Sequence, residues 1–219
     1  MEIAARLTAL QASLPPQVTL IAVSKTQPDA AILEAYATGQ RAFGENRVQD
    51  MKGKAERLPA DIQWHMIGHV QTNKIKDFAP FVHLVHGVDR LKVLQVLNQE
   101  AQKIGRVIDA LLQVHIAEEE SKFGFSPEEL QAALASDLPA AFPHVRIRGL
   151  MGMATFTDNA DQVRREFEGL AHLFRTSQTG MPPHFDQLSM GMSGDYPLAI
   201  ECGATHIRVG TAIFGARNY

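Results

Sequence analysis

Short apolar runs alternate with helical patterns along the whole of this 219-residue chain. Residues 18–23 form a nearly continuous apolar run with several β-branched side chains, as expected of a parallel strand that is buried on both faces. Apolar residues recur at helical spacing before this run, at residues 3–14, and after it, between Pro28 and Gly39. A chain that repeats this unit is restricted to an α/β architecture with a largely parallel sheet.

The alternation predicts eight strands with helical segments between them. The strands are expected at residues 18–23, 41–44, 63–67, 81–86, 110–116, 145–151, 185–189 and 206–209. Long helical patterns cover residues 90–104 and 158–175. Divided among eight units, the chain gives about 27 residues to each, which leaves little for a second domain. We therefore predict a single (β/α)8 TIM barrel domain over residues 1–219; an open, doubly wound sheet is the alternative, because periodicity does not distinguish the two.

The composition excludes several classes of protein. The 24 acidic residues outnumber the 21 basic ones, and the formal net charge of −3 argues against a general nucleic-acid binder. A single cysteine excludes a disulfide framework and favours a reducing compartment. The sequence shows neither an apolar run of about 20 residues, the length of a membrane span, nor a signal-peptide pattern. We expect a cytoplasmic protein without nucleic-acid or membrane partners.

Lys25 is the first candidate for chemistry. In a parallel α/β barrel the active site lies at the carboxyl ends of the strands, and Lys25 comes directly after the first apolar run, in the sequence VSKTQP. A lysine that is desolvated at this place can attack a carbonyl carbon and form a Schiff base. The alternative is a lysine that extends from a strand end to solvent.

Glu45 and Asn46 follow the second predicted strand, directly after Gly44. Either residue could cap the next helix, and Asn46 could also donate a hydrogen bond to a ligand that lies across the barrel mouth. The local sequence favours the helix cap, because capping is the commoner use of an asparagine after a glycine.

Glycines and hydroxyl residues follow the last two predicted strands. Ser193 and Gly194 follow the seventh strand, and Gly210 and Thr211 follow the eighth. Loops at these positions often bind phosphate through backbone N–H groups and hydroxyls near helix N-termini; the alternative is two glycine-rich turns with an N-cap serine. Together with Lys25, the two loops favour a phosphorylated ligand that carries a carbonyl group. Pyridoxal 5'-phosphate (PLP) fits this description.

Three other signals are given no functional role. His65 and His69 have the spacing of a helical zinc pair, but the segment is predicted to be a strand and no third ligand is evident, so no metal is expected. Cys202 is expected in the core. Four lysines that form small basic spots are expected on solvated faces. They are Lys52, Lys54, Lys74 and Lys76.

Longer blocks of sequence around these candidates resemble a known family. They are AVSKTQP around Lys25, FGENRVQD at residues 43–50, WHMIGHVQTNK at 64–74, ESKFGF at 120–125, RGLMGM at 148–153, LSMGMSGDYPLAIECGATHIRVGTAIFGAR at 188–217, and Tyr219. The chain resembles the pyridoxal phosphate homeostasis protein family, whose barrel is similar to the N-terminal domain of alanine racemase. The third and sixth blocks together are highly specific.

The resemblance implies a role for each matching position. Lys25 would form the internal Schiff base with PLP, Asn46 would lie close to the cofactor ring, and Arg208 would face the pyridine nitrogen. The phosphate would be held by Ser193, Gly210 and Thr211, and the site would be lined in addition by Ser189 and Met190. Only the resemblance points to Arg208. The segment before Lys25 is shorter than is usual in the family, which implies a trimmed first helix, and no function is assigned to His69.

The resemblance also implies a function. An arginine beside the pyridine nitrogen discourages protonation of that nitrogen and weakens the cofactor as an electron sink. Racemases take a second base from a second domain, and here the barrel uses the whole chain. We therefore expect a monomeric protein that holds PLP and delivers it to apo PLP-dependent enzymes. It would turn over no substrate and would affect vitamin B6 and amino-acid balance indirectly.

Two alternatives belong to other classes of function. One is a small PLP-dependent racemase or lyase that uses an unrecognised base such as Tyr196 or His86. The other is an interaction protein that signals the PLP status of the cell to a partner, and the sequence contains no motif for or against it.

Overall fold

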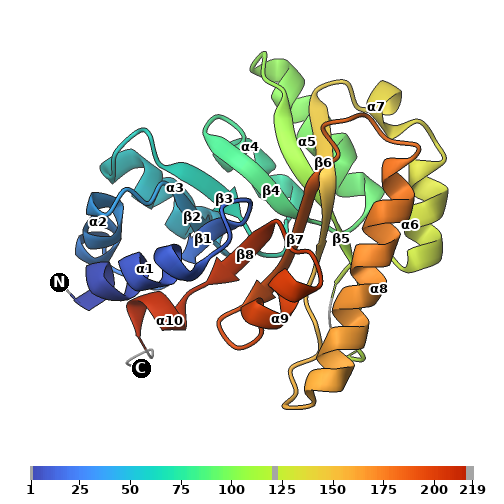
Figure 1. Ribbon diagram of the computed structural model, residues 1–219. Helices are drawn as coiled ribbons and strands as arrows, with labels where there is room; N and C mark the ends of the chain where they lie inside the picture. The colour runs from blue at the N-terminus through green and yellow to red at the C-terminus, as the bar shows by residue number, and fades with distance from the viewer. Residues whose placement is uncertain (1, 120–122, 216–219) are drawn as a thin grey trace.

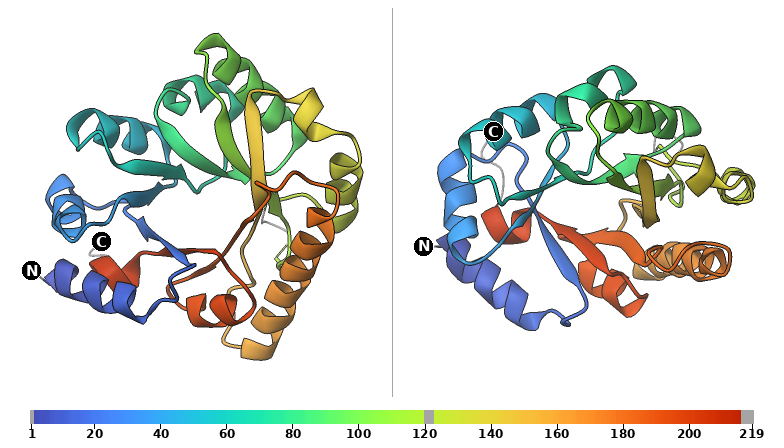
Figure 2. Two further views of the ribbon diagram at one scale, coloured as in Figure 1. Left: turned by 45° about the horizontal axis from the view of Figure 1, so that its top comes forward. Right: turned by 90° about the horizontal axis from the view of Figure 1, so that it is seen from above.

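Eight parallel strands, β1 to β8, close into a barrel in chain order in the computed structural model (Figures 1 and 2). The structure describes residues 2–119 and 123–215, so Lys122 and Tyr219 lie outside the described residues. The strands are β1 (Thr19–Val23), β2 (Ala42–Glu45), β3 (Gln63–Met66), β4 (Val82–Val88), β5 (Ile108–Val114), β6 (Val145–Gly152), β7 (Gln187–Met192) and β8 (His206–Val209). Closure between β1 and β8 confirms the predicted (β/α)8 TIM barrel and excludes the open sheet.

The helices lie outside the strands, as the right-hand view of Figure 2 shows. They are α1 (Glu2–Ser13), α2 (Asp29–Ala37), α3 (Val48–Arg57), α4 (Ile75–Phe78), α5 (Leu91–Lys103), α6 (Pro127–Leu134), α7 (Leu138–Ala141), α8 (Ala160–Gln178), α9 (Tyr196–Glu201) and α10 (Thr211–Phe214), with a 3-10 turn at Thr72–Lys74. The first and last described helices lie side by side, and Arg6 Nε on α1 donates to the carbonyl of Ile213 on α10 at 2.8 Å. Among the described residues, no helix is long and apolar enough to cross a membrane.

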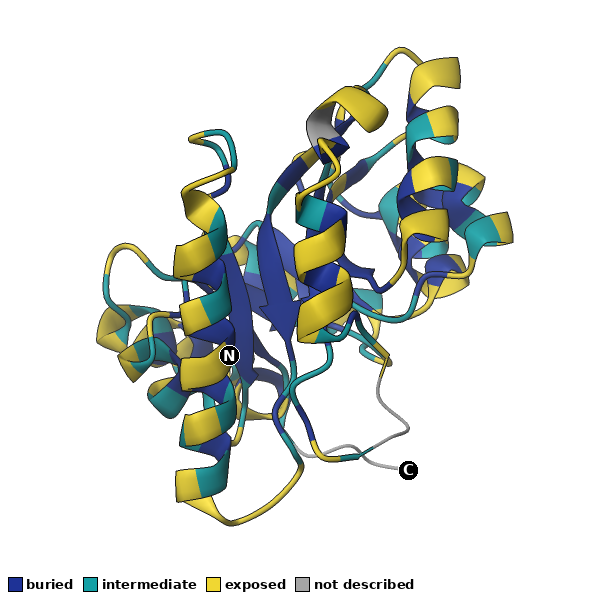
Figure 3. Ribbon diagram, turned by 90° about the vertical axis from the view of Figure 1, so that its right-hand side faces the viewer, coloured by how far each residue is buried: buried dark blue, intermediate teal, exposed yellow. Residues whose placement is uncertain are grey.

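Alternation along the strands divides the side chains between two layers. One set packs with the helices in a large apolar cluster, as Val85 and Leu112 do. The other set points into the barrel, where Leu84, Leu111 and Met151 form a small separate apolar cluster. Figure 3 shows that the strands are almost entirely buried beneath helices whose outer faces are exposed.

The seventh strand differs most from its prediction. It was expected to end at Ser189, but β7 continues to Met192. Gly191 allows this extension, because its φ of +92° is easily adopted by glycine and because a Cβ there would lie only 2.6 Å from Ala199 Cβ on α9. As a result, Ser193 comes directly after the end of the strand, at the mouth of the barrel.

Candidate functional site

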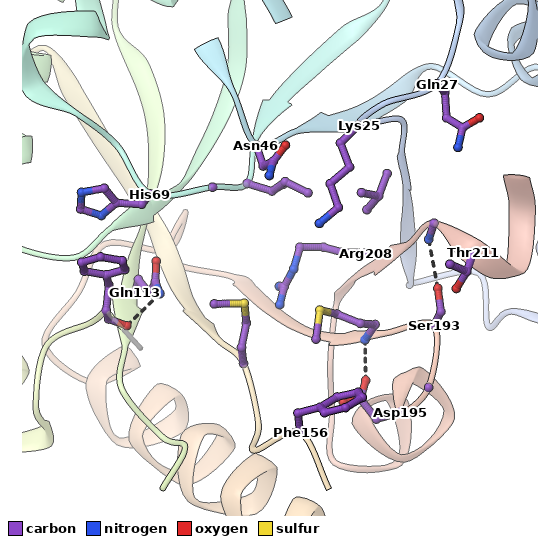
Figure 4. A pocket seen from close by; sticks show the side chains of 18 of the residues that line it. Lys25, Gln27, Asn46, His69, Gln113, Phe156, Ser193, Asp195, Arg208 and Thr211 are labelled. Atoms are coloured by element: carbon purple, nitrogen blue, oxygen red, sulfur yellow. Dashed lines mark hydrogen bonds between the residues drawn. The ribbon is translucent and has the colours of Figure 1, made fainter. Parts of the chain in front are cut away.

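A cavity of about 510 Å³ opens at the carboxyl ends of the strands (Figure 4). It lies where the active sites of (β/α)8 barrels are found. Its wall includes all six residues that the sequence analysis assigned to a cofactor site. They are Lys25, Asn46, Ser193, Arg208, Gly210 and Thr211. The structure therefore brings together candidates from the ends of β1, β2, β7 and β8.

Lys25 extends from the end of β1 into the cavity, toward Arg208 (Figure 4). The turn that follows it is tight: Gln27 N–H donates to the carbonyl of Ser24 at 3.0 Å, and Thr26 adopts a left-handed φ of 65°. That conformation is unfavourable for a β-branched residue and is maintained only where the surrounding structure fixes it. The lysine is half-buried and points across the mouth of the barrel rather than out into solvent.

Beneath this turn, three buried residues form what we call the Ser24–Glu45–Lys54 brace. Ser24 Oγ donates to Glu45 Oε1 at 2.5 Å, and Lys54 Nζ donates both to Glu45 Oε1 and to the carbonyl of Ser24, each at 2.8 Å. Ser24 and Glu45 immediately precede Lys25 and Asn46 in the sequence. The brace therefore fixes the ends of β1 and β2 side by side, with both candidate residues directed at the cavity.

The brace corrects two predictions. Lys54 was expected on a solvated face, but it shares the buried face of α3 with Val48 and Met51, at a helical spacing that the sequence displays. Glu45 and Asn46 were expected to cap α3, yet the N-cap position is Arg47, without a side-chain cap hydrogen bond. The carboxylate of Glu45 is used by the brace, and Asn46 lines the cavity instead.

Replacing Lys54 with methionine should lower the free energy of unfolding by about 3–5 kcal/mol, because it leaves the Glu45 carboxylate buried without its cation. The double variant Lys54→Met/Glu45→Gln removes both charges and should recover part of this loss. Urea unfolding of the single and double variants measures both effects. The exposed Lys52, which pairs with Asp77, provides a control: Lys52→Met should change stability by less than about 1 kcal/mol. Equal losses for Lys52→Met and Lys54→Met would contradict the prediction.

Arg208 lies on β8 and is buried in the barrel, with its guanidinium at the floor of the cavity. Its Nη1 donates to Ser189 Oγ at 2.5 Å, and its Nη2 donates to the carbonyl of Gly152 at 3.0 Å. Burial lowers the pKa of Arg208 to about 10, and the negative charge of Asp195 acts in the opposite direction. Arg208 therefore remains a cation at neutral pH. Within the described chain no carboxylate lies within ion-pair distance of it.

Two buried histidines continue this network below Ser189. His86 Nδ1 lies 2.9 Å from Ser189 Oγ, and His86 Nε2 lies 3.0 Å from His65 Nδ1. Burial holds the pKa of both rings well below the ordinary value, so both are neutral at pH 7. Arg208 can only donate, so Ser189 Oγ accepts from it, and the same hydroxyl shares a hydrogen bond with His86 Nδ1. The buried cation is thus surrounded by neutral hydrogen-bonding groups.

The structure also places four further residues that the sequence suggested as site or catalytic residues. Ser189 points into the barrel and supports Arg208 from below. Met190 was expected to line the site, but it packs in the outer apolar layer, one residue out of phase with Ser189 on the strand. Neither His86 nor Tyr196, the bases considered for an enzymatic alternative, lines the cavity.

The loops after β7 and β8 meet at one end of the cavity (Figure 4). Gly210 N–H donates to Ser193 Oγ at 3.1 Å, and Met192 N–H donates to Asp195 Oδ1 at 2.5 Å. A Cβ on Gly210 would lie 3.3 Å from the carbonyl oxygen of Val23, so a side chain there would crowd the end of β1. Hydroxyls and backbone amides from the two loops thus gather beside the strand that carries Lys25, as expected of an anion-binding end.

The opposite end of the cavity holds residues to which the sequence analysis assigned no function. His69, after β3, lines it together with Gln113 and Phe123. Its Nδ1 lies 2.8 Å from Oδ2 of Asp89, and its ring stacks on Phe123 at a centroid distance of 4.0 Å. His69 and Asp89 each follow the end of a strand. This is the criterion that selected Lys25 and Asn46, and it is the sequence signal that could have identified them.

The barrel, with a lysine and two loops of glycines and hydroxyl residues at its mouth, has the architecture of alanine racemase N-terminal domains. The family model described as "Alanine racemase, N-terminal domain" matches residues 1–218. The alanine racemase of Bartonella henselae is 16% identical, with a TM-score of 0.74, and the match covers 61% of that chain, which shows the shared fold.

More similar relatives identify the family. The "Pyridoxal phosphate homeostasis protein" of Haemophilus influenzae is 42% identical over 206 residues, covering 92% of this chain and 86% of the relative. PipY of Synechococcus elongatus, solved without PLP, is 41% identical with a TM-score of 0.92, covering 97% of this chain and 100% of PipY; its structure with PLP bound gives 0.88. The chain belongs to the pyridoxal phosphate homeostasis protein family, as its sequence blocks suggested.

Proposed function

We propose that this protein binds PLP, holds it at the barrel mouth and delivers it to apo PLP-dependent enzymes, without a reaction of its own. The observation that carries the proposal is that a lysine amine, a buried arginine and an anion-binding end face one cavity. Relatives named as homeostasis proteins, rather than as enzymes, and the PLP-bound structure of PipY support it. The whole chain would act as one PLP-binding barrel domain and as a monomer. The unpaired thiol of Cys202 suits a cytoplasmic setting.

The residues present fit this cofactor. When bound, PLP supplies an aldehyde that forms a Schiff base with an amine and a ring that withdraws electrons. Lys25 would provide the amine, and Arg208 would lie against the ring nitrogen, with Asn46 at the edge of the ring. The phosphate would be held by Ser193, Gly210 and Thr211.

The charge of Arg208 weakens the cofactor as an electron sink without forbidding turnover, so the case for holding also depends on the lack of a placed base. A cation next to the ring nitrogen disfavours its protonation, which limits the withdrawal of electrons from a bound amine. Carbanion chemistry also needs a base of suitable pKa placed at the α-carbon. His86 is fully buried below Ser189, is hydrogen-bonded to it through Nδ1 and does not line the cavity, so it cannot act there.

Lys25→Ala should abolish the imine absorption of the PLP-loaded protein and leave the fold intact, because a side chain at the barrel mouth contributes little to packing. Absorption spectra and the mass of the borohydride-reduced protein measure the covalent adduct, and circular dichroism measures the fold. Lys76→Ala, at an exposed lysine away from the cavity, is the matched control and should keep the adduct. A reducible adduct that survives in Lys25→Ala would assign the Schiff base to another amine. Lys122, in the sequence block ESKFGF, is the next candidate.

Ser193→Ala and Thr211→Ala should each weaken PLP binding roughly ten- to a hundredfold, since each removes one hydrogen bond to a charged group, worth about 1.5–3 kcal/mol. The backbone N–H of Gly210 remains, so the adduct on Lys25 should still form. Titration with pyridoxal, which lacks the phosphate, is the control and should show no change. Equal losses for PLP and pyridoxal would mean that the hydroxyls support the fold instead.

The racemase or lyase alternative differs in the fate of the α-hydrogen. If the protein is a carrier, an amino acid labelled with deuterium at the α-carbon should keep its label during incubation with the loaded protein. Mass spectrometry of the recovered amino acid measures retention, with free PLP as the reference. Stereospecific loss of the label that is faster than with free PLP, and absent in Lys25→Ala, would contradict the carrier function.

A further inference from the structure

His69 lies on the cavity wall across from Lys25 (Figure 4), and Asp89 is paired with it. Asp89, after β4, is almost fully buried, with 3% of its side chain exposed; Oδ1 accepts from Arg90 and Oδ2 faces His69 Nδ1 at 2.8 Å. A carboxylate can only accept, so the hydrogen of the neutral imidazole lies on Nδ1. The lone pair is therefore on Nε2, to which no described residue is bonded.

The position of this histidine is fixed by close backbone packing. A Cβ on Gly68 would lie 2.5 Å from the carbonyl oxygen of Asn46, and a Cβ on Gly87 would lie 2.3 Å from the carbonyl oxygen of Gly68. Glycine at both positions lets the chain segments after β2 and β3 and the end of β4 touch without side chains between them. The ring of His69 is then held against Phe123, with 32% of the side chain still exposed.

The cavity therefore has two chemically different ends. Ser193 and Thr211 lie at the anion-binding end, and His69 lies at the other, beside Gln113 and Phe123 (Figure 4). Lys25 and His69 follow β1 and β3, which are two strand spacings, or about 10 Å, apart. A ligand anchored by its phosphate and attached to Lys25 thus leaves the His69 end for a second molecule.

We propose that His69, oriented by Asp89, accepts the proton of an incoming primary amine that takes the cofactor from Lys25; this rests on the proposed function. Suitable amines are amino acids and lysine side chains. The ammonium loses one proton to His69 Nε2, and its nitrogen bonds to the aldehyde-derived carbon. A second proton then moves from that nitrogen to Lys25 Nζ as the bond from the carbon to Lys25 Nζ breaks. His69 gives the first proton to the departing lysine amine, which leaves as an ammonium ion. No electrons are gained or lost.

A base is needed because primary amines are ammonium ions at neutral pH, with a lysine-type pKa of about 10.4, and an ammonium has no lone pair to attack with. A histidine can change its protonation state in this pH range. An imidazole oriented by a carboxylate through Nδ1 is the arrangement by which proteins position such bases. His69 is then a proton acceptor for delivery and has no part in reaction at an α-carbon.

The test compares two amines on the loaded wild type and on His69→Gln, Asp89→Asn and His172→Gln. Ethylamine is an ammonium ion at neutral pH, whereas hydroxylamine is largely unprotonated. Borohydride trapping and mass spectrometry first establish the adduct on Lys25, and loss of its absorption gives the exchange rate. His69→Gln should slow exchange with ethylamine on the order of 100-fold and leave hydroxylamine unaffected. Asp89→Asn should likewise slow exchange with ethylamine and leave exchange with hydroxylamine unaffected. His172, exposed on α8 away from the cavity, is the matched control and should change neither rate.

The cofactor-free protein offers an independent readout. Nitrogen-15 NMR of its histidines should show the neutral His69 ring as the Nδ1–H tautomer. The Nε2–H tautomer would overturn the inference. Equal slowing of both amines in His69→Gln would indicate a structural role and would also overturn it, as would no slowing with either amine. Loss of α-deuterium that depends on His69 would make it the base of an enzyme. A wild type without a Lys25 adduct would overturn the proposed function and this inference together, whereas an adduct with His69-independent exchange would overturn the inference alone.

Discussion

The buried ion pair between Glu45 and Lys54 determines how the mouth of this barrel is built. It lies between β2 and α3, and through Ser24 it also holds the end of β1. A buried ion pair is weak evidence for stability, because a pair of apolar residues of similar volume is often as stable. What the pair adds is geometry: an apolar contact would tolerate sliding of β1 against β2, whereas three short hydrogen bonds fix the positions of Lys25 and Asn46. The strained turn at Thr26 is stable only on such a fixed base.

The sequence was sufficient for the architecture, and it selected residues that the structure gathers at one cavity. Eight alternations of strand and helix predicted the closed barrel, and the rule that sites lie at strand ends selected Lys25, Ser193, Gly210 and Thr211, all of which line one cavity. The barrel and the shared position of these residues were predictable because they depend only on periodicity and on where a strand stops; the binding roles of the residues stay predictions. Polar and apolar residues also alternate along β8, where His206 and Arg208 are polar and Ile207 and Val209 are apolar. This alternation indicates that Arg208 points into the barrel, although only the family resemblance drew attention to it.

The errors arose where the direction of a side chain depends on tertiary partners. Lys54 looked like a surface lysine because its partner Glu45 lies nine residues away and on another element, and no local pattern reveals a buried pair. Asn46 looked like a cap because it follows a glycine, but the N-cap of helix α3 is Arg47, one residue later. Met190 is an error of a different kind, because local alternation with Ser189 on the same strand already directs it to the outer layer.

The polar floor of the cavity explains how a charged arginine can be kept inside a barrel. Three neighbouring strands, β4 to β6, fill part of the interior with Leu84, Leu111 and Met151, while β3, β7 and β8 contribute His65, Ser189 and Arg208. An unpaired buried cation is costly unless dipoles replace its hydration, and here a carbonyl and a serine backed by two neutral histidines do so. Under the proposed function, the cofactor is attached at two separate points, by a covalent bond at Lys25 and by hydrogen bonds at the phosphate end. An incoming amine can then replace Lys25 while the phosphate is still held. The cofactor leaves the protein only when the covalent bond and the phosphate hydrogen bonds are both broken. Two such linked attachments retain a ligand far longer than either alone, yet neither has to be so strong that a recipient cannot take the ligand over.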